Sequence, residues 1–90
     1  MNTVLVVDDE KNIRGTLKDV LEDEGYVVFL AENGREALNV IERNAVDAVL
    51  LDLWLPEIGG MDVLQTIKSG NNDLQVIIIT GHGSIDAAVK

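Results

Sequence analysis

Four short apolar runs recur along this chain, at residues 3–7, 26–31, 47–51 and 74–79. Most of their positions are apolar in succession rather than in alternation, which is typical of parallel strands buried on both faces. Longer stretches with apolar residues at helical spacing separate the runs. This alternation of strand and helix predicts an α/β fold with a doubly wound parallel sheet.

Three helices are expected between the strands, each with one apolar face. The first spans residues 10–24 and ends at Gly25, because a glycine suits the C-terminal cap. The second spans residues 35–43, and the third lies between Gly60 and Gly70. The side chains expected to face the core are Ile13, Leu17, Val20 and Leu21 in the first helix, Ala37, Leu38 and Ile41 in the second, and Met61, Leu64 and Ile67 in the third.

The C-terminal residues do not complete this pattern. Ser84 suits the N-cap of a last helix that begins at Ile85, but only about six residues remain, too few for a stable isolated helix. Such a helix normally crosses over to another parallel strand, and none follows. The run at 74–79 would then be an open apolar edge that invites pairing, as a dimer or an edge-paired oligomer. We therefore expect residues 1–90 to form one domain that is incomplete at its C-terminus.

Carboxylates stand at the ends of two of the predicted strands. Asp8 and Asp9 follow the first run, and Asp52 follows the third. The carboxyl ends of neighbouring parallel strands meet at one edge of the sheet, so these three side chains should converge. Like charges at close range repel unless a hard cation joins them, and Mg²⁺ is bound by carboxylates of this kind. The sequence therefore predicts a magnesium site.

The same site has candidates for phosphoryl chemistry. Asp52 is a single carboxylate at the end of a central strand, which makes it the candidate nucleophile that would form an acyl phosphate. Thr80 ends the fourth run, and its hydroxyl would hydrogen-bond a phosphoryl oxygen. Simpler explanations remain open: Asp8 and Asp9 would also favour the positive end of the first helix, and an Asp or Thr at a strand end is often structural. His82, between two glycines, is expected to be a loop residue without a metal role.

Composition narrows the range of partners. The formal net charge of −9 argues against direct binding of nucleic acid and against docking on anionic membranes. The absence of cysteine excludes a disulfide framework and a Cys-ligated zinc. Met1 leads directly into the first run, with neither a signal peptide nor a membrane span ahead of it, so a cytoplasmic location is expected.

Other phosphate sites fit the residues poorly. A dinucleotide site needs a glycine-rich turn after the first strand, and a P-loop needs its lysine. The acidic turn at residues 8–10 would instead repel a phosphate, and flavin mononucleotide is disfavoured for the same reason. Phosphatases of the haloacid dehalogenase type have Asp-x-Asp at this place, whereas Asp8 and Asp9 are adjacent. A Mg²⁺-dependent phosphatase is therefore the less favoured alternative.

Four motifs in this order and spacing resemble those of response regulator receiver domains. The segment from residue 80 to 89 is most similar to receivers of the nitrogen-regulator class, which precede an ATPase domain and a DNA-binding domain in transcriptional activators. The matching motifs are Val7-Asp8-Asp9-Glu10, Asn33-Gly34-x-Glu36-Ala37-Leu38, Asp52-x-x-Leu55-Pro56-x-x-x-Gly60 and Thr80-Gly81-His82-Gly83-Ser84.

The resemblance implies a flavodoxin-like receiver fold with strand order 2-1-3-4, and a signalling switch rather than an enzyme. Asp52 would accept a phosphoryl group from a sensor histidine kinase. Asp9 would bind Mg²⁺ directly and Asp8 largely through water, with the backbone carbonyl of Trp54 as a further ligand. Thr80 would be the switch hydroxyl. ATPase and DNA-binding domains would be expected downstream in the full-length protein.

One departure from the family leaves a second interpretation open. Receivers have a fifth parallel strand that ends in a lysine paired with the phosphoryl group, followed by a fifth helix. The 90 residues stop before both. The alternative is a receiver fold that cannot switch and serves as an interaction or oligomerisation module.

Overall fold

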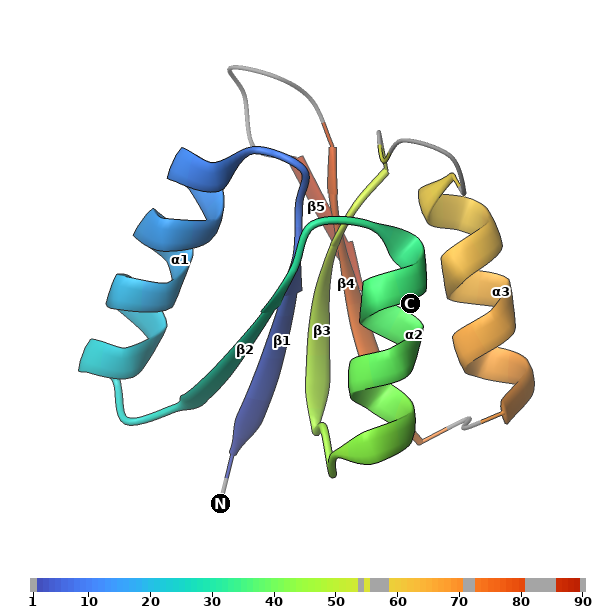
Figure 1. Ribbon diagram of the computed structural model, residues 1–90, viewed down its shortest axis with the longest axis horizontal. Coiled ribbons are helices and arrows are strands. Elements are labelled where there is room, and N and C mark those ends of the chain that lie inside the picture. The colour runs from blue at the N-terminus through green and yellow to red at the C-terminus, as the bar shows by residue number, and fades with distance from the viewer. Residues whose placement is uncertain (1, 54, 56–58, 71–72, 81–85, 90) are drawn as a thin grey trace.

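The computed structural model describes residues 2–53, 55, 59–70, 73–80 and 86–89. A twisted sheet lies between two helical layers, with α1 on one face and α2 and α3 on the other (Figure 1). None of the described helices combines the length and the apolar character needed to cross a bilayer. The elements in chain order are β1 (Thr3–Val7), α1 (Lys11–Asp23), β2 (Val27–Ala31), α2 (Gly34–Arg43), β3 (Ala48–Asp52), α3 (Gly60–Gly70), β4 (Gln75–Thr80) and β5 (Asp86–Val89).

The strand order is β2-β1-β3-β4-β5, and the first four strands in this order are parallel. The predicted order 2-1-3-4 is therefore confirmed. All four of the expected strands and all three of the helices between them begin and end within about one or two residues of their predicted bounds. The carboxyl ends of β1 and β3 lie side by side, with Val7 paired to Leu51.

The prediction of a helix after residue 84 is wrong. Residues Asp86–Val89 form β5, which pairs antiparallel with β4, with Ile77 opposite Val89. A helix this short gains too few hydrogen bonds to offset its nucleation cost, whereas pairing satisfies the backbone groups along β4. The proposed N-cap Ser84 and the helix start Ile85 lie outside the described residues. Because β5 covers β4, the expected open edge at 74–79 is wrong as well.

The main core lies between the sheet and the layer of α2 and α3. Leu5, Val49 and Val76 are fully buried there, beneath Ala37 of α2 and Val63 of α3. These side chains leave water on folding, and this burial supplies the main free energy that holds the layers together. Leu64 and Ile67 are buried as predicted, but Met61 is 50% exposed, so its predicted burial is wrong. It lies in the first turn of α3, beyond the edge of the buried face.

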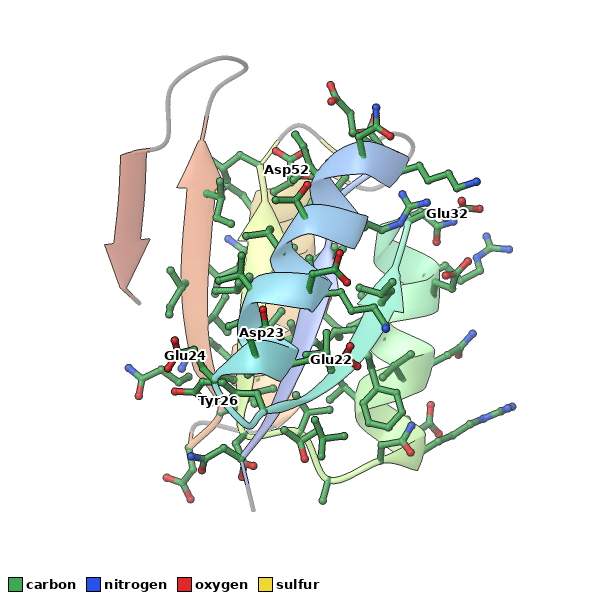
Figure 2. The ribbon with its side chains drawn as sticks, turned by 90° about the vertical axis from the view of Figure 1, so that its left-hand side faces the viewer. Glu22, Asp23, Glu24, Tyr26, Glu32 and Asp52 are labelled. Carbon is green, nitrogen blue, oxygen red and sulfur yellow. The ribbon has the colours of Figure 1, made fainter. Side chains whose placement is uncertain are left out.

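The opposite face of the sheet is less well covered. α1 packs on β1 and β2, and none of its residues is buried (Figure 2). Leu17 and Leu21 are half-buried, while Ile13 is 37% and Val20 is 55% exposed. The predicted burial of these last two is therefore wrong, because α1 is the only described helix on this face and packs mainly on β1 and β2, which leaves the rim of its apolar stripe exposed.

Gly25 ends α1 as the sequence predicts. Its φ of +91° lies in the left-handed region, which L-residues with a side chain rarely adopt. The Gly25 amide donates to the carbonyl of Glu22 at 3.0 Å, and the Tyr26 amide donates to the carbonyl of Leu21 at 3.1 Å. The chain is thereby turned sharply from α1 into β2.

Candidate functional site

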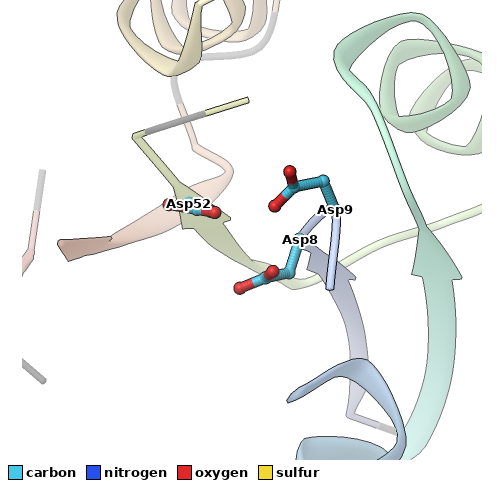
Figure 3. A group of neighbouring side chains, drawn as sticks. All are labelled: Asp8, Asp9 and Asp52. Carbon is cyan, nitrogen blue, oxygen red and sulfur yellow. The ribbon is translucent and has the colours of Figure 1, made fainter. Parts of the chain in front are cut away.

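Three carboxylates meet at the carboxyl edge of the sheet, as the sequence predicts. Asp8 follows β1 directly, Asp9 is the next residue, and Asp52 is the last residue of β3. One oxygen from each side chain lies within 4.8 Å of the others (Figure 3). Since Val7 is paired with Leu51, the next residues along the two strands are Asp8 and Asp52, and the sheet itself brings them together.

The three acids differ in their surroundings. Asp8 is 4% and Asp52 is 7% exposed, whereas Asp9 is exposed. Burial of a carboxylate among apolar residues is costly unless hydrogen bonds or a cation compensate. Asp8 is partly compensated, because its Oδ1 accepts a hydrogen bond from the Glu10 amide at 2.9 Å.

Burial raises the pKa of Asp8, since desolvation penalises its charged form. The hydrogen bond from the Glu10 amide lowers this pKa, and the negative charges of Asp52, Asp9 and Glu10 raise it again. The net direction is upward. The site therefore holds its negative charge at a cost in free energy, which a bound cation would relieve.

The donor set fits a hard divalent cation. All three groups offer carboxylate oxygens, which are the ligands that Mg²⁺ and Ca²⁺ prefer. Mg²⁺ is typically held by a few carboxylates and completes its octahedron with water and phosphoryl oxygens. The exposure of Asp9 leaves the pocket open on the solvent side, where such additional ligands would enter.

The chain beyond Asp52 is packed tightly against the start of α3. A Cβ placed on Gly60 would lie 2.6 Å from the carbonyl oxygen of Asp52 and 2.7 Å from the Cα of Leu53. The Gly60 amide donates to the carbonyl of Leu53 at 3.3 Å. A glycine at residue 60, which the sequence analysis gave only as a helix boundary and a motif position, therefore allows this close approach beside the candidate nucleophile.

The remaining predicted site residues are only partly described. Thr80 is the last residue of β4, and because Asp52 pairs with Ile79, its backbone lies at the same edge as the carboxylates. The hydroxyl of Thr80, the carbonyl of Trp54 and the side chain of His82 lie outside the described part of the chain. Their predicted roles stay predictions.

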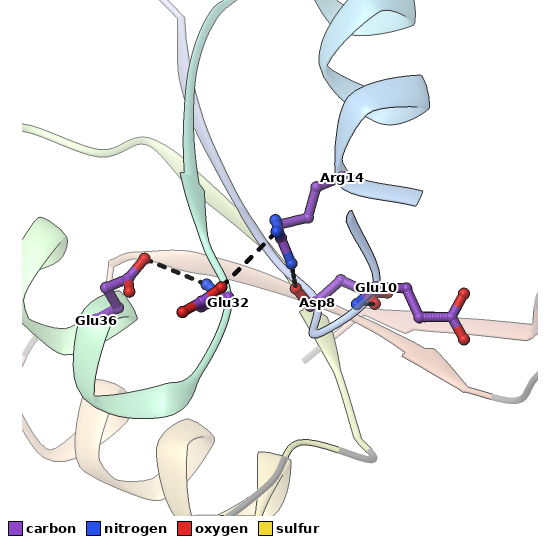
Figure 4. A network of polar contacts seen from close by, with 5 residues as sticks. All are labelled: Asp8, Glu10, Arg14, Glu32 and Glu36. Atoms are coloured by element: carbon purple, nitrogen blue, oxygen red, sulfur yellow. Dashed lines mark hydrogen bonds and ion pairs between the residues drawn. The ribbon is translucent and has the colours of Figure 1, made fainter. Parts of the chain in front are cut away.

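A network of polar contacts beside the pocket was missed by the sequence analysis (Figure 4). Arg14 Nη1 donates to the backbone carbonyl of Asp8 at 2.7 Å, and Nη2 lies 3.9 Å from Glu32 Oε2. The Glu32 amide in turn donates to Glu36 Oε1 at 3.3 Å. One signal was present in the sequence: Arg14 is a cation spaced three and seven residues before Leu17 and Leu21, which were expected to face the core.

Comparison with known proteins decides the family. Residues 4–90 match the model of the response regulator receiver domain. The chain belongs to this family. Receivers are signalling domains of two-component systems, so the resemblance seen in the four motifs is confirmed.

Relatives of this receiver include longer regulators. It is 43% identical over 89 residues to an NtrX-like response regulator from Rickettsia bellii, covering 97% of this chain and 19% of that protein. It is 38% identical over 86 residues to the response regulator MprA from Mycolicibacterium vanbaalenii, covering 96% of this chain and 37% of that protein. This receiver thus spans about a fifth to somewhat over a third of these relatives.

Solved structures share the fold of this receiver. TrrA from Thermotoga maritima, solved in complex with Mg²⁺-BeF, has a TM-score of 0.87 and 42% identity over 92% of this chain and 72% of that one. NtrX from Brucella abortus, in complex with ADP, has a TM-score of 0.86 and 38% identity over 92% of this chain and 20% of that one. The predicted similarity to the nitrogen-regulator class is confirmed by these NtrX neighbours.

Proposed function

We propose that this receiver is a phospho-accepting switch, in which Asp52 takes a phosphoryl group from a phosphohistidine of a sensor histidine kinase. The carboxylate cluster carries the proposal, because oxygens of Asp8, Asp9 and Asp52 lie within 4.8 Å of one another in a chain of this family. The TrrA structure supports it, since that neighbour is a complex with Mg²⁺-BeF, which resembles a metal-bound phosphoryl group.

The chemistry assigned to Asp52 is a direct displacement. One carboxylate oxygen forms a bond to the phosphorus while the bond between phosphorus and the imidazole nitrogen breaks, and its electron pair returns to the imidazole ring. The product is an acyl phosphate on Asp52. As the last residue of β3, Asp52 has its backbone held in the sheet, so its carboxylate is presented from a fixed position.

The residues that would hold Mg²⁺ are Asp8, Asp9 and Asp52, with the backbone carbonyl of Trp54 as the fourth protein ligand that the family implies. When bound, the cation supplies positive charge that offsets the carboxylates and the incoming phosphoryl oxygens. Thr80 would then donate its hydroxyl to a phosphoryl oxygen and transmit the change to the residues that follow it in the chain.

Phosphorylation of the 90-residue chain by a small acyl phosphate, followed by intact mass, tests the proposal. We expect one phosphoryl group in the presence of Mg²⁺, none after Mg²⁺ is removed by chelation, and none in Asp52→Asn. Asp62→Asn, which changes an exposed acid in the first turn of α3, is the matched control and should be phosphorylated normally. A folded wild-type chain that takes up no phosphoryl group would overturn the assignment.

A second candidate is a receiver fold that binds partners without switching. The observation in its favour is β5, because Asp86–Val89, beyond the switch position, form a strand in the sheet rather than a free helix. Amide correlation spectra with and without Mg²⁺ and beryllofluoride separate the two. Signals that move around Asp9 and Asp52 support the switch, while dispersed signals that stay in place support the module.

A Mg²⁺-dependent phosphatase is the third and weakest candidate, because the adjacent pair Asp8 and Asp9 differs from the Asp-x-Asp arrangement. It predicts turnover of a chromogenic phosphate ester, which the switch does not.

We place this receiver in the cytoplasm, in a longer regulator whose ATPase and DNA-binding domains follow it. The length and names of the NtrX-like relatives support this arrangement. The net charge of −9 disfavours DNA contacts by the receiver itself and is consistent with DNA contacts made by those domains.

A further inference from the structure

We infer that Arg14 is a positioning residue for the cation pocket, which it serves by holding the peptide group that joins Asp8 to Asp9. This inference rests on the proposed function, in that it assumes a pocket that binds Mg²⁺. Arg14 does not belong to the group of side chains that would bind the cation. It donates a hydrogen bond to the backbone carbonyl of Asp8 beside them (Figure 4).

The backbone of Asp8 is held at both of its polar groups. Its amide donates to the carbonyl of Ala31 in β2 at 3.1 Å. Its carbonyl accepts the hydrogen bond from Arg14 Nη1 at 2.7 Å, a short bond to a charged donor. The hydrogen bond of the amide is part of the pairing between β1 and β2. Arg14 adds a second restraint, which fixes the orientation of the carbonyl.

That carbonyl belongs to the peptide bond between Asp8 and Asp9. A peptide group is planar, so fixing the direction of the oxygen also fixes the amide nitrogen and the Cα of Asp9. Asp9 is the exposed member of the cluster, and its side chain has the least packing to hold it in place. Arg14 therefore determines where the Asp9 carboxylate is directed.

Arg14 is itself held in place. Its side chain is 14% exposed, and its second nitrogen lies 3.9 Å from Glu32, whose side chain is 61% exposed. An ion pair this long and this exposed is weak because water screens it, so the 2.7 Å hydrogen bond to the Asp8 carbonyl is the main contact of the guanidinium. The forked guanidinium can contact both groups at once. It thereby links α1 to Asp8 after β1 and to Glu32 after β2.

The test compares Mg²⁺ affinities of variants of the 90-residue chain, followed by amide chemical shifts. Arg14→Gln should weaken Mg²⁺ binding about tenfold, as loss of a supporting residue around metal ligands usually does. Lys18→Gln is the matched control, because it removes the same charge from the same helix at a side chain that is 40% exposed and pairs with Glu22 at 3.0 Å. It should change the affinity less than twofold.

Arg14→Lys separates positioning from charge and is the variant least disturbing to folding. It keeps the charge and the aliphatic stem but loses the planar fork. We expect it to weaken binding about threefold, and to shift the Asp9 amide signal in the metal-free protein, as Arg14→Gln should and Lys18→Gln should not.

Two results would overturn the inference. One is an Arg14→Gln chain that is folded by its amide dispersion and binds Mg²⁺ as tightly as Lys18→Gln. The other is full recovery of affinity and of the Asp9 signal in Arg14→Lys, since charge alone would then explain the effect. A wild-type chain that does not bind Mg²⁺ would instead contradict the proposed function.

Discussion

At the scale of single residues, Asp8 shows how the site works against the fold. It is buried beside two further carboxylates, and its pKa is raised by that burial. The clustering of Asp8 with Asp52 could be predicted from sequence, because two apolar runs ending in acids become neighbours in any parallel sheet that pairs them. The burial of Asp8 and the contact with Arg14 could not, since both depend on how α1 is placed.

Asp8→Asn should stabilise the metal-free protein at neutral pH and abolish tight Mg²⁺ binding, because the amide removes a charge from the cluster. Thermal unfolding with and without Mg²⁺ measures both the stability and the stabilisation by the cation. A gain of 1 kcal/mol in the free energy of unfolding corresponds to about 4–8 °C in Tm for a domain of this size. Asp23→Asn, at an exposed site at the far end of α1, is the control and should change the Tm little (Figure 2).

The pH dependence follows from the direction of the pKa shift. The folded-state pKa of Asp8 lies above the value of 3.8 for the unfolded chain. Its protonation therefore adds stability that is complete below pH 3.8 and is lost as the pH rises through the raised pKa. The metal-free wild type should lose stability relative to Asp8→Asn across this window. Parallel stability profiles of the two proteins would contradict this account.

Gly60 offers a second test at this scale. Gly60→Ala should lower the free energy of unfolding by about 1–3 kcal/mol, the usual range for overpacking, because its Cβ would lie 2.6 Å from the Asp52 carbonyl oxygen. Gly70→Ala, at the other end of α3, has no atom within 4 Å of its Cβ and should not destabilise. Urea unfolding distinguishes the two variants. Equal midpoints for Gly60→Ala and Gly70→Ala would show that the backbone between β3 and α3 shifts to accommodate the added Cβ.

At the scale of elements, local signals predicted the helices and parallel strands well, and the chain terminus poorly. The first four strands are apolar in succession and are bounded by turn residues, so the hydrophobic pattern and the turn residues predict the same boundaries. Residues 86–89 have no such agreement: the segment is short, and its state is set by the neighbouring edge of β4. The exposure of Val20 was missed for a similar reason, because helical periodicity identifies an apolar face without showing what covers it.

The start of α2 provides a prediction at this scale. Asn33 Oδ1 accepts a hydrogen bond from the Glu36 amide at 2.8 Å and caps the helix. Asn33→Ala should lower the free energy of unfolding by about 1 kcal/mol, the usual cost of losing such a cap. Asn39→Ala, at an exposed position inside the same helix, should be neutral or slightly stabilising. A destabilisation by Asn39→Ala as large as that of Asn33→Ala would refute the capping role.

At the scale of the whole molecule, the two faces of the sheet are covered unequally. Val76 and Ile78 belong to the core under α2 and α3, whereas Ile77 and Ile79 alternate with them and are only half-buried on the α1 side. Among the described elements, α1 is the only helix on that side, and it packs on β1 and β2 (Figure 2). An apolar area of this kind favours association.

We therefore expect the 90-residue chain to self-associate as its concentration rises, through the α1 side rather than through the β4 edge. Val20→Lys should reduce the association without loss of stability, because Val20 is 55% exposed. Met61→Lys, at a side chain 50% exposed on the opposite face, should leave it unchanged. Light scattering over a concentration series provides the measurement, and a wild-type monomer throughout would exclude the association.

The pairing of β1 with β3 has a consequence for how the chain folds. Val7 lies opposite Leu51, and a slip of one residue would turn Asp52 to the other face of the sheet, away from Asp8. Only the native alignment then presents three carboxylates to one ion. A ligand adds its binding free energy only to the state that binds it. Mg²⁺ in the folding medium would thus stabilise the correctly aligned sheet relative to sheets with a slipped register, and so reduce the population of misaligned chains.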